Sequence, residues 1–286
     1  MKILSVDVGG TYTKFAVLNE KAKFFEQGKI DTPKESHEDF LQMIEKLFRN
    51  YEVEGIALSL PGIIDTNRGL CITSGTLGYN DGKFIVAELE KICGVKISLE
   101  NDANCAAIAE AKIGSLSDVE DGFVMVFGTM IGGAFIKNHK IHRGKNFLSG
   151  EVSFMFDSLG KKFFWQNSSV YSLLKNYATT KNLSEKVSGR KFFQAVEEND
   201  FDAVNCLENF TYQIARQIFN IQMILDPEKF AIGGGISEQK IFIEKIRENL
   251  QKVYSESPTK FPTVEVVPCK FHNDANLIGA LFRWLE

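Results

Sequence analysis

Short runs of apolar and β-branched residues alternate along the chain with segments whose apolar residues recur at helical spacing. The first run, residues 2–18, is interrupted at Gly9-Gly10 and therefore predicts a β-hairpin. Ser36 is followed by an acid three residues later, a pattern that caps the first turn of a helix. Further elements are expected in the order strand, helix, strand, helix, at residues 54–62, 83–92, 95–100 and about 101–114. The pattern is typical of an α/β domain.

The second half of the chain repeats this plan. Residues 122–138 form another apolar run with a glycine-rich turn, and the tetrapeptide Asn-Asp-Ala-Asn occurs at both 101–104 and 273–276. Further predicted elements are helices near 169–178, 188–199 and 201–225, a strand at 229–237, a helix capped by Ser237 and ending near 254, and a strand at 264–271. The repetition indicates an internal duplication, so we expect two related α/β domains that face each other across a cleft.

The domain boundary is expected in residues 115–121, a polar stretch without periodicity. We therefore predict an N-terminal α/β domain over residues 1–117 and a C-terminal α/β domain over residues 118–272. The last helix, within residues 273–286, is expected to pack back on the N-terminal domain and complete it. The chain of 286 residues is long enough for this division, because single cores rarely grow beyond about 250–300 residues.

Composition and charge exclude several classes of partner. The 33 basic and 37 acidic residues give a formal net charge of −4, which does not favour nucleic acid or an acidic membrane as a ligand. No apolar run reaches the ~20 residues of a membrane span, and Asp7 comes too early for a signal peptide. We expect a cytoplasmic protein without nucleic-acid or membrane partners.

The five cysteines, at positions 71, 93, 105, 206 and 269, are widely scattered. No pair has the spacing of a zinc site or a redox motif, and no histidine stands nearby at ligand spacing. We interpret them as small buried hydrophobic residues.

Three glycine turns follow apolar strands and are candidate phosphate seats, because successive glycine amides can close on an anion without a Cβ in the way. Each turn alone could be a plain hairpin turn. Asp7 sharpens the hypothesis: a carboxylate at the end of an apolar strand needs a partner, either Mg²⁺ held through water beside a phosphate or a turn that it caps. Lys14 could neutralise phosphate or point away. The turns comprise Gly9, Gly10 and Thr11; Gly128, Thr129, Gly132 and Gly133; and Gly233, Gly234 and Gly235.

The segment Ser98–Glu110 concentrates polar side chains ahead of an alanine-rich helix. Asn101, Asp102 or Asn104 could cap this helix, and one cap would be enough. Asp102 is therefore either a cap or a reactive carboxylate. The second copy of the tetrapeptide, 273–276, is interpreted as a helix cap.

At these residues the sequence resembles the ROK family, bacterial sugar kinases and sugar-responsive repressors of the actin-like ATPase superfamily. The resemblance covers essentially the whole chain, in the segments DVGGTYTKFAVL, SLPGIID, ENDANCAAIAE, FGTMIGGAFI, HRGKNFLSGE and IGGGIS. It implies the two-domain actin-like ATPase (ribonuclease H-like) fold and a homodimer. It also implies that ATP and Mg²⁺ are used, with ATP phosphates on the first two glycine turns and the adenosine beside the third.

The resemblance further implies site residues. Asp102 would be the catalytic base that takes a proton from a sugar hydroxyl, Asn101 and Glu151 would hold other hydroxyls, and Gly62 would line the sugar. A carboxylate in that role typically increases the reaction rate by 10²–10⁴-fold. Phosphoryl transfer otherwise depends on positioning and charge neutralisation.

Two departures from the family pattern bear on substrate and metal. Phe154 stands where many members have a histidine, and the cysteines of their zinc site are missing, so no zinc is expected. An aromatic ring there could stack on a sugar. Met130 replaces the usual middle glycine of the second phosphate loop.

Members without zinc resemble β-glucoside kinases, and residues 69–84 are similar to the corresponding segment of those enzymes. The preferred expectation is an ATP-dependent kinase acting on the 6-hydroxyl of a β-glucoside, with N-acetylmannosamine kinase or glucokinase as alternatives. A non-catalytic sugar-sensing regulator is the alternative of another class. A repressor is not favoured, because no DNA-reading segment precedes the first glycine loop.

Overall fold

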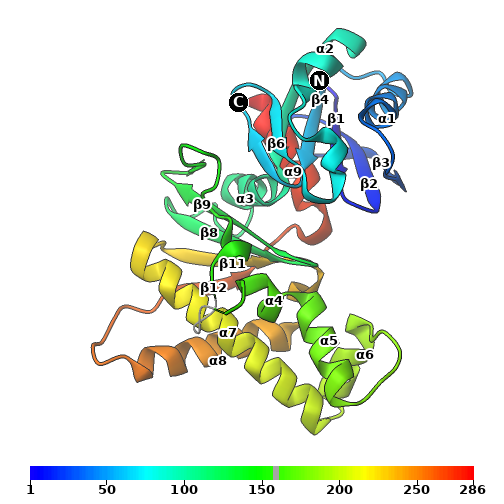
Figure 1. Ribbon diagram of the computed structural model, residues 1–286. Helices are drawn as coiled ribbons and strands as arrows, with labels where there is room; N and C mark the ends of the chain where they lie inside the picture. Colours follow the sequence, from blue (N-terminus) through cyan, green and yellow to red (C-terminus); the bar gives the residue numbers. More distant parts are fainter. Residues whose placement is uncertain (157–160) are drawn as a thin grey trace. The chain divides into compact units, whose positions relative to one another are not determined.

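The computed structural model describes residues 1–156 and 161–286, which fold into two compact units (Figure 1). The first unit comprises Met1–Ile113, Lys140–Ser149 and Asp274–Glu286. The second comprises Gly114–His139 and Gly150–Asn273. The segment 140–149 thus groups with the first unit, outside the range 1–117 that the sequence indicated for that domain.

The sheet of the first unit has the strand order β3-β2-β1-β4-β7. β1 pairs antiparallel with β2 and parallel with β4, and β4 continues parallel to β7. Asp7, Ser59 and Glu100 are register partners on neighbouring strands and form one row across the sheet. The strands are β1 (Ile3–Val8), β2 (Tyr12–Leu18), β3 (Phe24–Asp31), β4 (Gly55–Leu60) and β7 (Lys96–Asn101).

Helices cover both faces of this sheet because its central strands are apolar on both sides, as parallel strands require. α1 (His37–Arg49) and α2 (Ile85–Cys93) pack on the face that carries Leu4, Ile56 and Leu99. α3 (Asp102–Ile113) and α9 (Ala275–Leu285) belong to the opposite face, which carries Ile3 and Ala57. The remaining elements of this unit are β5 (Ile63–Asp65), β6 (Leu70–Thr73), η1 (Gly75–Asn80) and β10 (Lys140–Ile141). η4 (His272–Asp274) includes the point at which the chain passes from the second unit back to the first.

The second unit has the same topology. β9, β8, β11 and β12 follow one another across its sheet, with β8–β9 antiparallel and β8–β11–β12 parallel. This repeats the order β2-β1-β4-β7 of the first unit, as the internal repetition predicted. The elements are β8 (Gly122–Phe127), β9 (Ile131–Lys137), η2 (Val152–Phe154), α4 (Phe164–Ser168), α5 (Val170–Thr180), α6 (Gly189–Glu197), α7 (Phe201–Leu225), β11 (Lys229–Gly233), η3 (Gly235–Glu238), α8 (Lys240–Glu256) and β12 (Glu265–Pro268).

The core of the second unit is rich in phenylalanine. Phe127 and Phe230 of the sheet pack against helix residues that include Phe210 and Phe242. α7 and α8 lie side by side (Figure 1). Edge-to-face and stacked ring pairs of this kind add to the burial of apolar area.

The ends of the helices confirm one of the two predicted N-caps, Ser36. Ser36 accepts a hydrogen bond from Asp39 N at 3.1 Å, Gly94 ends α2 in the left-handed conformation, and Asp226 does so for α7. The expected cap at Ser237 is wrong. Its hydroxyl donates to Gly234 O at 2.8 Å, so Ser237 lies in η3, and α8 begins later, at Lys240.

Among the described residues, none of the helices combines the length and apolarity needed to cross a bilayer.

The five cysteines are free thiols, buried or half-buried, and burial raises the pKa of each thiol for which a shift is resolved, to about 11 for Cys71.

α3 and α9 cross in close contact at Gly279. A Cβ built on Gly279 would lie 1.7 Å from Cys105 O, a backbone atom that cannot move aside. The crossing matters because α3 carries Asp102 at its start.

We predict that Gly279→Ala destabilises the protein by about 1–3 kcal/mol through overpacking. Helix propensity alone would favour the change by about 1 kcal/mol, so the sign of the effect separates the two contributions. Equilibrium denaturant unfolding measures it. Gly189→Ala in α6, where a Cβ would meet no atom within 4 Å, is the control and should not lose stability. Equal stabilisation in both variants would contradict the close crossing.

Candidate functional site

The first glycine turn joins β1 and β2. Gly9 N donates to Tyr12 O at 3.1 Å, and Thr32 Oγ1 donates to Gly9 O at 2.7 Å. A Cβ on Gly10 would lie 2.6 Å from Thr76 Oγ1. The turn therefore needs small residues, and Gly10 and Thr11 at its tip are exposed.

Asp7 lies at the end of β1 beside this turn. Ser59 Oγ donates to Asp7 Oδ1 at 2.8 Å, and Asn276 Nδ2 donates to the same oxygen at 3.0 Å. Burial raises the pKa of the Asp7 carboxyl, while these two hydrogen bonds and the charge of Lys14, its register partner on β2, act in the opposite direction. A carboxylate so held is a suitable oxygen ligand for Mg²⁺ or a magnesium-bound water.

Asn276 is the last residue of the second Asn-Asp-Ala-Asn copy, so that copy is more than the helix cap that the sequence indicated. Asp274 occupies the cap position of α9 without a side-chain capping hydrogen bond. The amide of Asn276 is directed to Asp7 instead, because a buried carboxylate requires donors.

In the first copy of the tetrapeptide, Asn101 and Asp102 make different contacts. Asn101 Oδ1 accepts from Asn104 N at 3.0 Å and is therefore the capping side chain of α3. Asn101 Nδ2 donates to Gly62 O at 2.8 Å, which fixes the other end of the amide. Asp102 is the first residue of α3, and its Oδ1 accepts from Ala103 N at 2.8 Å.

Gly62 is placed by backbone geometry. Its φ is +102°, and a Cβ there would lie 2.0 Å from Thr73 O. Only glycine fits this position, so the carbonyl that holds Asn101 depends on it.

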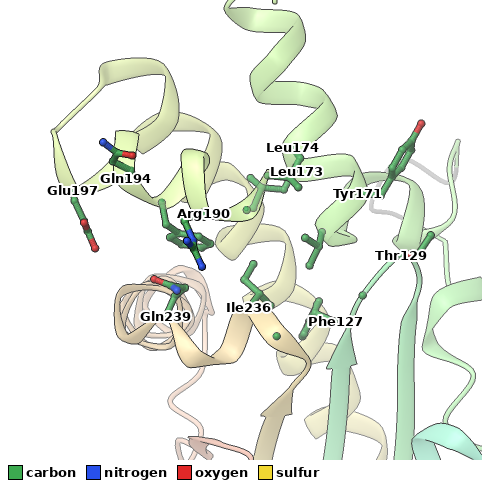
Figure 2. Close-up of a pocket in the computed structure, with 15 residues that line it drawn as sticks. Phe127, Thr129, Tyr171, Leu173, Leu174, Arg190, Gln194, Glu197, Ile236 and Gln239 are labelled. Atoms are coloured by element: carbon green, nitrogen blue, oxygen red, sulfur yellow. The ribbon is translucent and has the colours of Figure 1, made fainter. Parts of the chain in front are cut away.

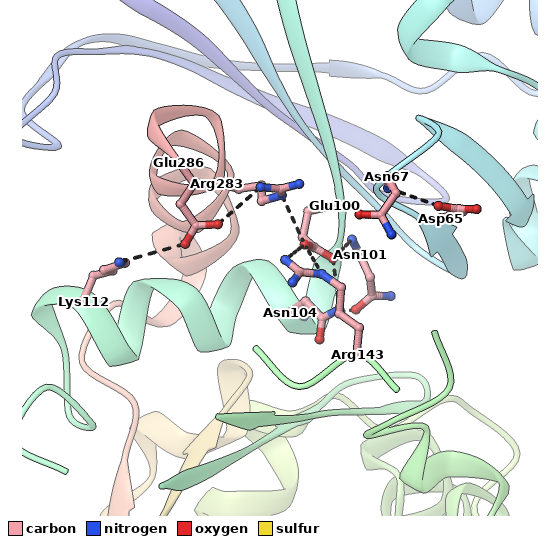
Figure 3. Close-up of polar contacts among 9 residues, drawn as sticks. All are labelled: Asp65, Asn67, Glu100, Asn101, Asn104, Lys112, Arg143, Arg283 and Glu286. Atoms are coloured by element: carbon pink, nitrogen blue, oxygen red, sulfur yellow. Dashed lines mark hydrogen bonds and ion pairs between the residues drawn. The ribbon is translucent and has the colours of Figure 1, made fainter. Parts of the chain in front are cut away.

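Glu100 and Arg143 are polar residues of this region that the sequence interpretation missed (Figure 3). The Glu100 side chain is fully buried, and its Oε2 accepts from Arg143 Nε at 3.0 Å and from a second nitrogen of the same guanidinium. A glutamate that ends an apolar strand was the available signal, since such a group is buried only with a partner. The position of the partner in sequence could not be inferred.

The second and third glycine turns lie in the second unit. Gly128 N donates to Met130 O at 2.9 Å, so the loop turns at Thr129 with Met130 in the position usually held by glycine. Gly132 and Gly133 lie in β9. Gly234 has a φ of +86° and packs against Phe127 O, while a Cβ on Gly235 would meet open space.

Beside these two turns lies a cavity of about 850 Å³ that the sequence did not reveal (Figure 2). Gly128, Thr129 and Gly235 line it, and Leu173 and Ile236 contribute apolar surface. Its polar residues include Arg190, Gln194, Glu197 and Gln239. An apolar slot with a few polar groups is typical of small-molecule sites.

Glu151 directly precedes η2 in the second unit, and Phe154 is the last residue of η2. Burial raises the pKa of the Glu151 carboxyl above its usual value of 4.5. Gly150, with φ +96°, packs so tightly on β9 that a Cβ would lie 2.3 Å from Gly133 O, which fixes the chain just before Glu151. The Phe154 side chain is 53% exposed, and its ring contacts Phe163 edge-on at 6.0 Å.

The predicted site residues thus fall into two groups. The first unit contains Asp7, the first glycine turn, Lys14, Gly62, Asn101 and Asp102, and the second contains the other two glycine turns, Glu151 and Phe154. Within residues 1–156 and 161–286, no three His, Cys, Asp or Glu side chains are arranged to hold a metal ion.

Comparison of the sequence with protein-family models identifies the family of the chain. The model of the ROK family matches residues 3–157 and 166–286. The chain belongs to the ROK family. This confirms the resemblance found in its motifs and the two-domain actin-like ATPase fold.

ROK relatives with curated names are similar over their full length. A β-glucoside kinase of Listeria monocytogenes is 28% identical over 100% of this chain and 98% of its own. A β-glucoside kinase of Klebsiella pneumoniae is 29% identical, covering 99% and 96%. An N-acetyl-D-glucosamine kinase of Vibrio atlanticus is 27% identical, covering 96% and 97%.

Solved ROK structures share the fold. A ROK family protein from Streptococcus pneumoniae in complex with sucrose aligns with a TM-score of 0.91 at 29% identity, covering 100% of this chain and 98% of its own. A putative N-acetylmannosamine kinase from Listeria monocytogenes aligns with a TM-score of 0.90 at 26% identity, covering 100% and 99%.

Because the pKa of Glu151 is raised, we predict that Glu151→Gln changes the pH dependence of the stability of the ligand-free protein. Between pH 4.5 and the raised pKa, the folded wild type holds more protons than the unfolded chain, so its stability falls as pH rises through that window. The variant lacks this loss and should be the more stable protein at pH 7–8, with the difference shrinking below pH 4.5. Thermal unfolding across pH measures this. Glu185→Gln, at an exposed position, should show no such difference, and a destabilised Glu151→Gln at pH 8 would contradict the effect.

Proposed function

We propose that this ROK protein is a β-glucoside kinase that transfers the γ-phosphate of ATP to the 6-hydroxyl of a glucoside. At the level of reaction class, the chain is an ATP-dependent sugar kinase. The observation that carries the catalytic assignment is that Asn101, and not Asp102, caps α3. Asp102 is the first residue of the helix, its Oδ1 accepts from Ala103 N, and we assign to it the role of base.

In the proposed reaction, Asp102 accepts the proton of the attacking hydroxyl. The hydroxyl oxygen then bonds to the γ-phosphorus while the bond from that phosphorus to the bridging oxygen of ADP breaks. Asn101, Gly62 and Glu151 would hold the sugar, and Phe154 would stack on a ring. Positioning of this kind supplies most of the acceleration in phosphoryl transfer.

The nucleotide would occupy the glycine turns and the adjoining cavity. Phosphates would lie against the turn formed by Gly9, Gly10 and Thr11 and the turn formed by Gly128, Thr129 and Gly132, with Lys14 adding positive charge. The N–H groups of Gly9 and Gly128 donate within their own turns and hold them in shape. The adenosine would enter the cavity beside Gly234 and Gly235, whose volume of about 850 Å³ is large enough for it. Its apolar residues, among them Leu173 and Ile236, suit a purine.

Mg²⁺ would be held by Asp7 through water. The fit rests on the carboxylate itself: Ser59 and Asn276 both bind Oδ1 and set the orientation of the group. When bound, the ion neutralises charge on the transferred phosphate. Zinc is not part of the proposal.

The β-glucoside assignment is supported by Phe154 in place of a metal-binding histidine and by the two similar kinases of that name. N-acetylmannosamine kinase and glucokinase are the alternatives within the same chemistry. A non-catalytic sugar-sensing regulator is the alternative of another class. A cytoplasmic homodimer completes the proposal.

An assay of ADP release with ATP and Mg²⁺ over a panel of sugars tests this function. The panel contains cellobiose, an aryl β-glucoside, glucose, N-acetylmannosamine and N-acetylglucosamine. We expect the highest kcat/KM with the β-glucosides. A monosaccharide preferred tenfold would replace the substrate assignment, and sugar binding without any turnover would favour the sensor.

We predict that Asp102→Asn lowers kcat by about 10²–10⁴-fold, because the variant cannot accept the proton. The amide can still accept from Ala103 N, so fold and ATP affinity should be unchanged. Steady-state kinetics and calorimetric ATP titration measure this. Asp226→Asn, at the left-handed end of α7, is the matched control. Turnover near the wild-type rate in Asp102→Asn would rule out the base.

We predict that Gly235→Leu raises KM for ATP by about tenfold or more, since its side chain would enter the cavity. The Cβ meets no atom within 4 Å, so the fold should tolerate the change. The KM for sugar serves as an internal control and should stay within twofold. An unchanged KM for ATP would place the nucleotide elsewhere.

A further inference from the structure

Glu100 joins three segments of the first unit through one buried carboxylate (Figure 3). Oε2 receives both guanidinium bonds of Arg143, from the segment 140–149, and lies 3.7 Å from Arg283 Nε on α9. Arg283 Nη1 also forms an ion pair with Glu286 Oε2 at 3.3 Å, and Glu286 Oε1 lies 3.9 Å from Nζ of Lys112 at the end of α3. The network therefore connects β7, both ends of α3, α9 and the segment 140–149.

The other oxygen of Glu100 holds the start of α3. Oε1 accepts from Asn101 N at 3.0 Å and from Asn104 Nδ2 at 2.9 Å. Asn104 N in turn donates to Asn101 Oδ1, and Asn101 Nδ2 donates to Gly62 O. Asp102 lies between the two asparagines, so the carboxylate of Glu100 binds the backbone N–H of the residue before it and the side-chain amide of the residue two positions after it.

We propose that Glu100, oriented by Arg143, is a positioning residue that fixes Asn101 and Asp102 in the geometry needed for proton transfer. This inference rests on the proposed function for its kinetic consequence. Its structural part, an immobilised first turn of α3, does not.

The energetics of buried ion pairs favour positioning over mere stability. A buried pair can often be replaced by neutral groups without loss of stability, so its presence is not required for folding. A buried hydrogen-bonded network does, however, restrict its members to one arrangement, and both oxygens of Glu100 are hydrogen-bonded. Misplacement of a catalytic group by about 1 Å can cost ~10²-fold in rate.

Arg143 is the principal partner of Glu100. Its guanidinium makes two hydrogen bonds, whereas Arg283 Nε is a buried atom without a hydrogen-bond partner among the residues that the structure describes. Arg283 stays close enough to compensate part of the charge when Arg143 is removed. Variants at Arg143 should therefore remain folded.

The test uses Glu100→Gln in the full-length protein. The glutamine oxygen can still accept from Asn101 N and Asn104 Nδ2, but the charge that orients the group toward Arg143 is gone. We expect kcat to fall by about 10- to 100-fold, with KM for ATP unchanged within twofold. Amide hydrogen exchange should become faster at Ala103, Asn104 and Cys105.

A double variant separates positioning from stability. Glu100→Gln/Arg143→Met removes both charges, so its melting temperature should recover relative to Arg143→Met alone while its kcat stays low. Arg143→Lys keeps the charge without the two-pronged geometry and should recover only part of kcat. Full recovery of kcat in the double variant would overturn the positioning role.

The control is Glu45→Gln on α1. Glu45 also accepts two hydrogen bonds from one arginine, Arg49, at 3.0 and 2.6 Å, but on the surface and away from α3. It should leave kcat and exchange in α3 unchanged. If Glu100→Gln also leaves both unchanged, the inference fails.

Failure of the proposed kinase function can be distinguished from failure of the inference about Glu100. If the wild type phosphorylates no sugar in the panel, the exchange measurement still reports whether Glu100 immobilises the first turn of α3. Should Glu100→Gln fail to fold, Arg143→Met provides the same kinetic and exchange comparison. Normal exchange in Arg143→Met would then overturn the inference.

Discussion

Asp7, Ser59 and Glu100 form a polar row across the parallel strands of the first unit, and two carboxylates in such a row must find donors. Besides Ser59 and Arg143, the donors come from the two Asn-Asp-Ala-Asn copies. Asn276 binds Asp7, and Asn104 binds Glu100, so the fourth residue of each copy meets one acid of the row. α3 and α9 can both reach the row because Gly279 allows them to cross closely over this face of the sheet.

The need for donors explains which polar residues before α3 hold the structure together and which one is available as a catalytic candidate. Asn101, Asn104 and Glu100 bind one another at the start of α3, which accounts for most of the polar residues that precede the alanine-rich helix. Asp102 is not needed as the cap. In the second unit, the glycine turns instead adjoin an apolar cavity, so the two units offer different surfaces despite their common topology.

Much of the fold could be predicted from local sequence. The hairpins at the first two glycine turns and the Ser36 cap depend on a few adjacent residues, and all are found. Ser237 was misjudged because it lies in η3, where its hydroxyl donates to Gly234 O instead of accepting from the first turn of α8. The ROK motifs identified the family, yet they did not reveal Arg143, Asn276 or the residues that line the cavity.

The sequence by itself determined the repeated α/β plan, the glycine turns and the candidate carboxylates, because periodicity, capping and glycine freedom are local properties. Tertiary structure decided which carboxylate is paired with which donor. Asn276 is far from Asp7 along the chain, and Arg143 is far from Glu100, so only the folded arrangement brings them within hydrogen-bond distance. Burial then sets the cost of leaving either acid unpaired, and burial is a property of the whole fold rather than of any segment.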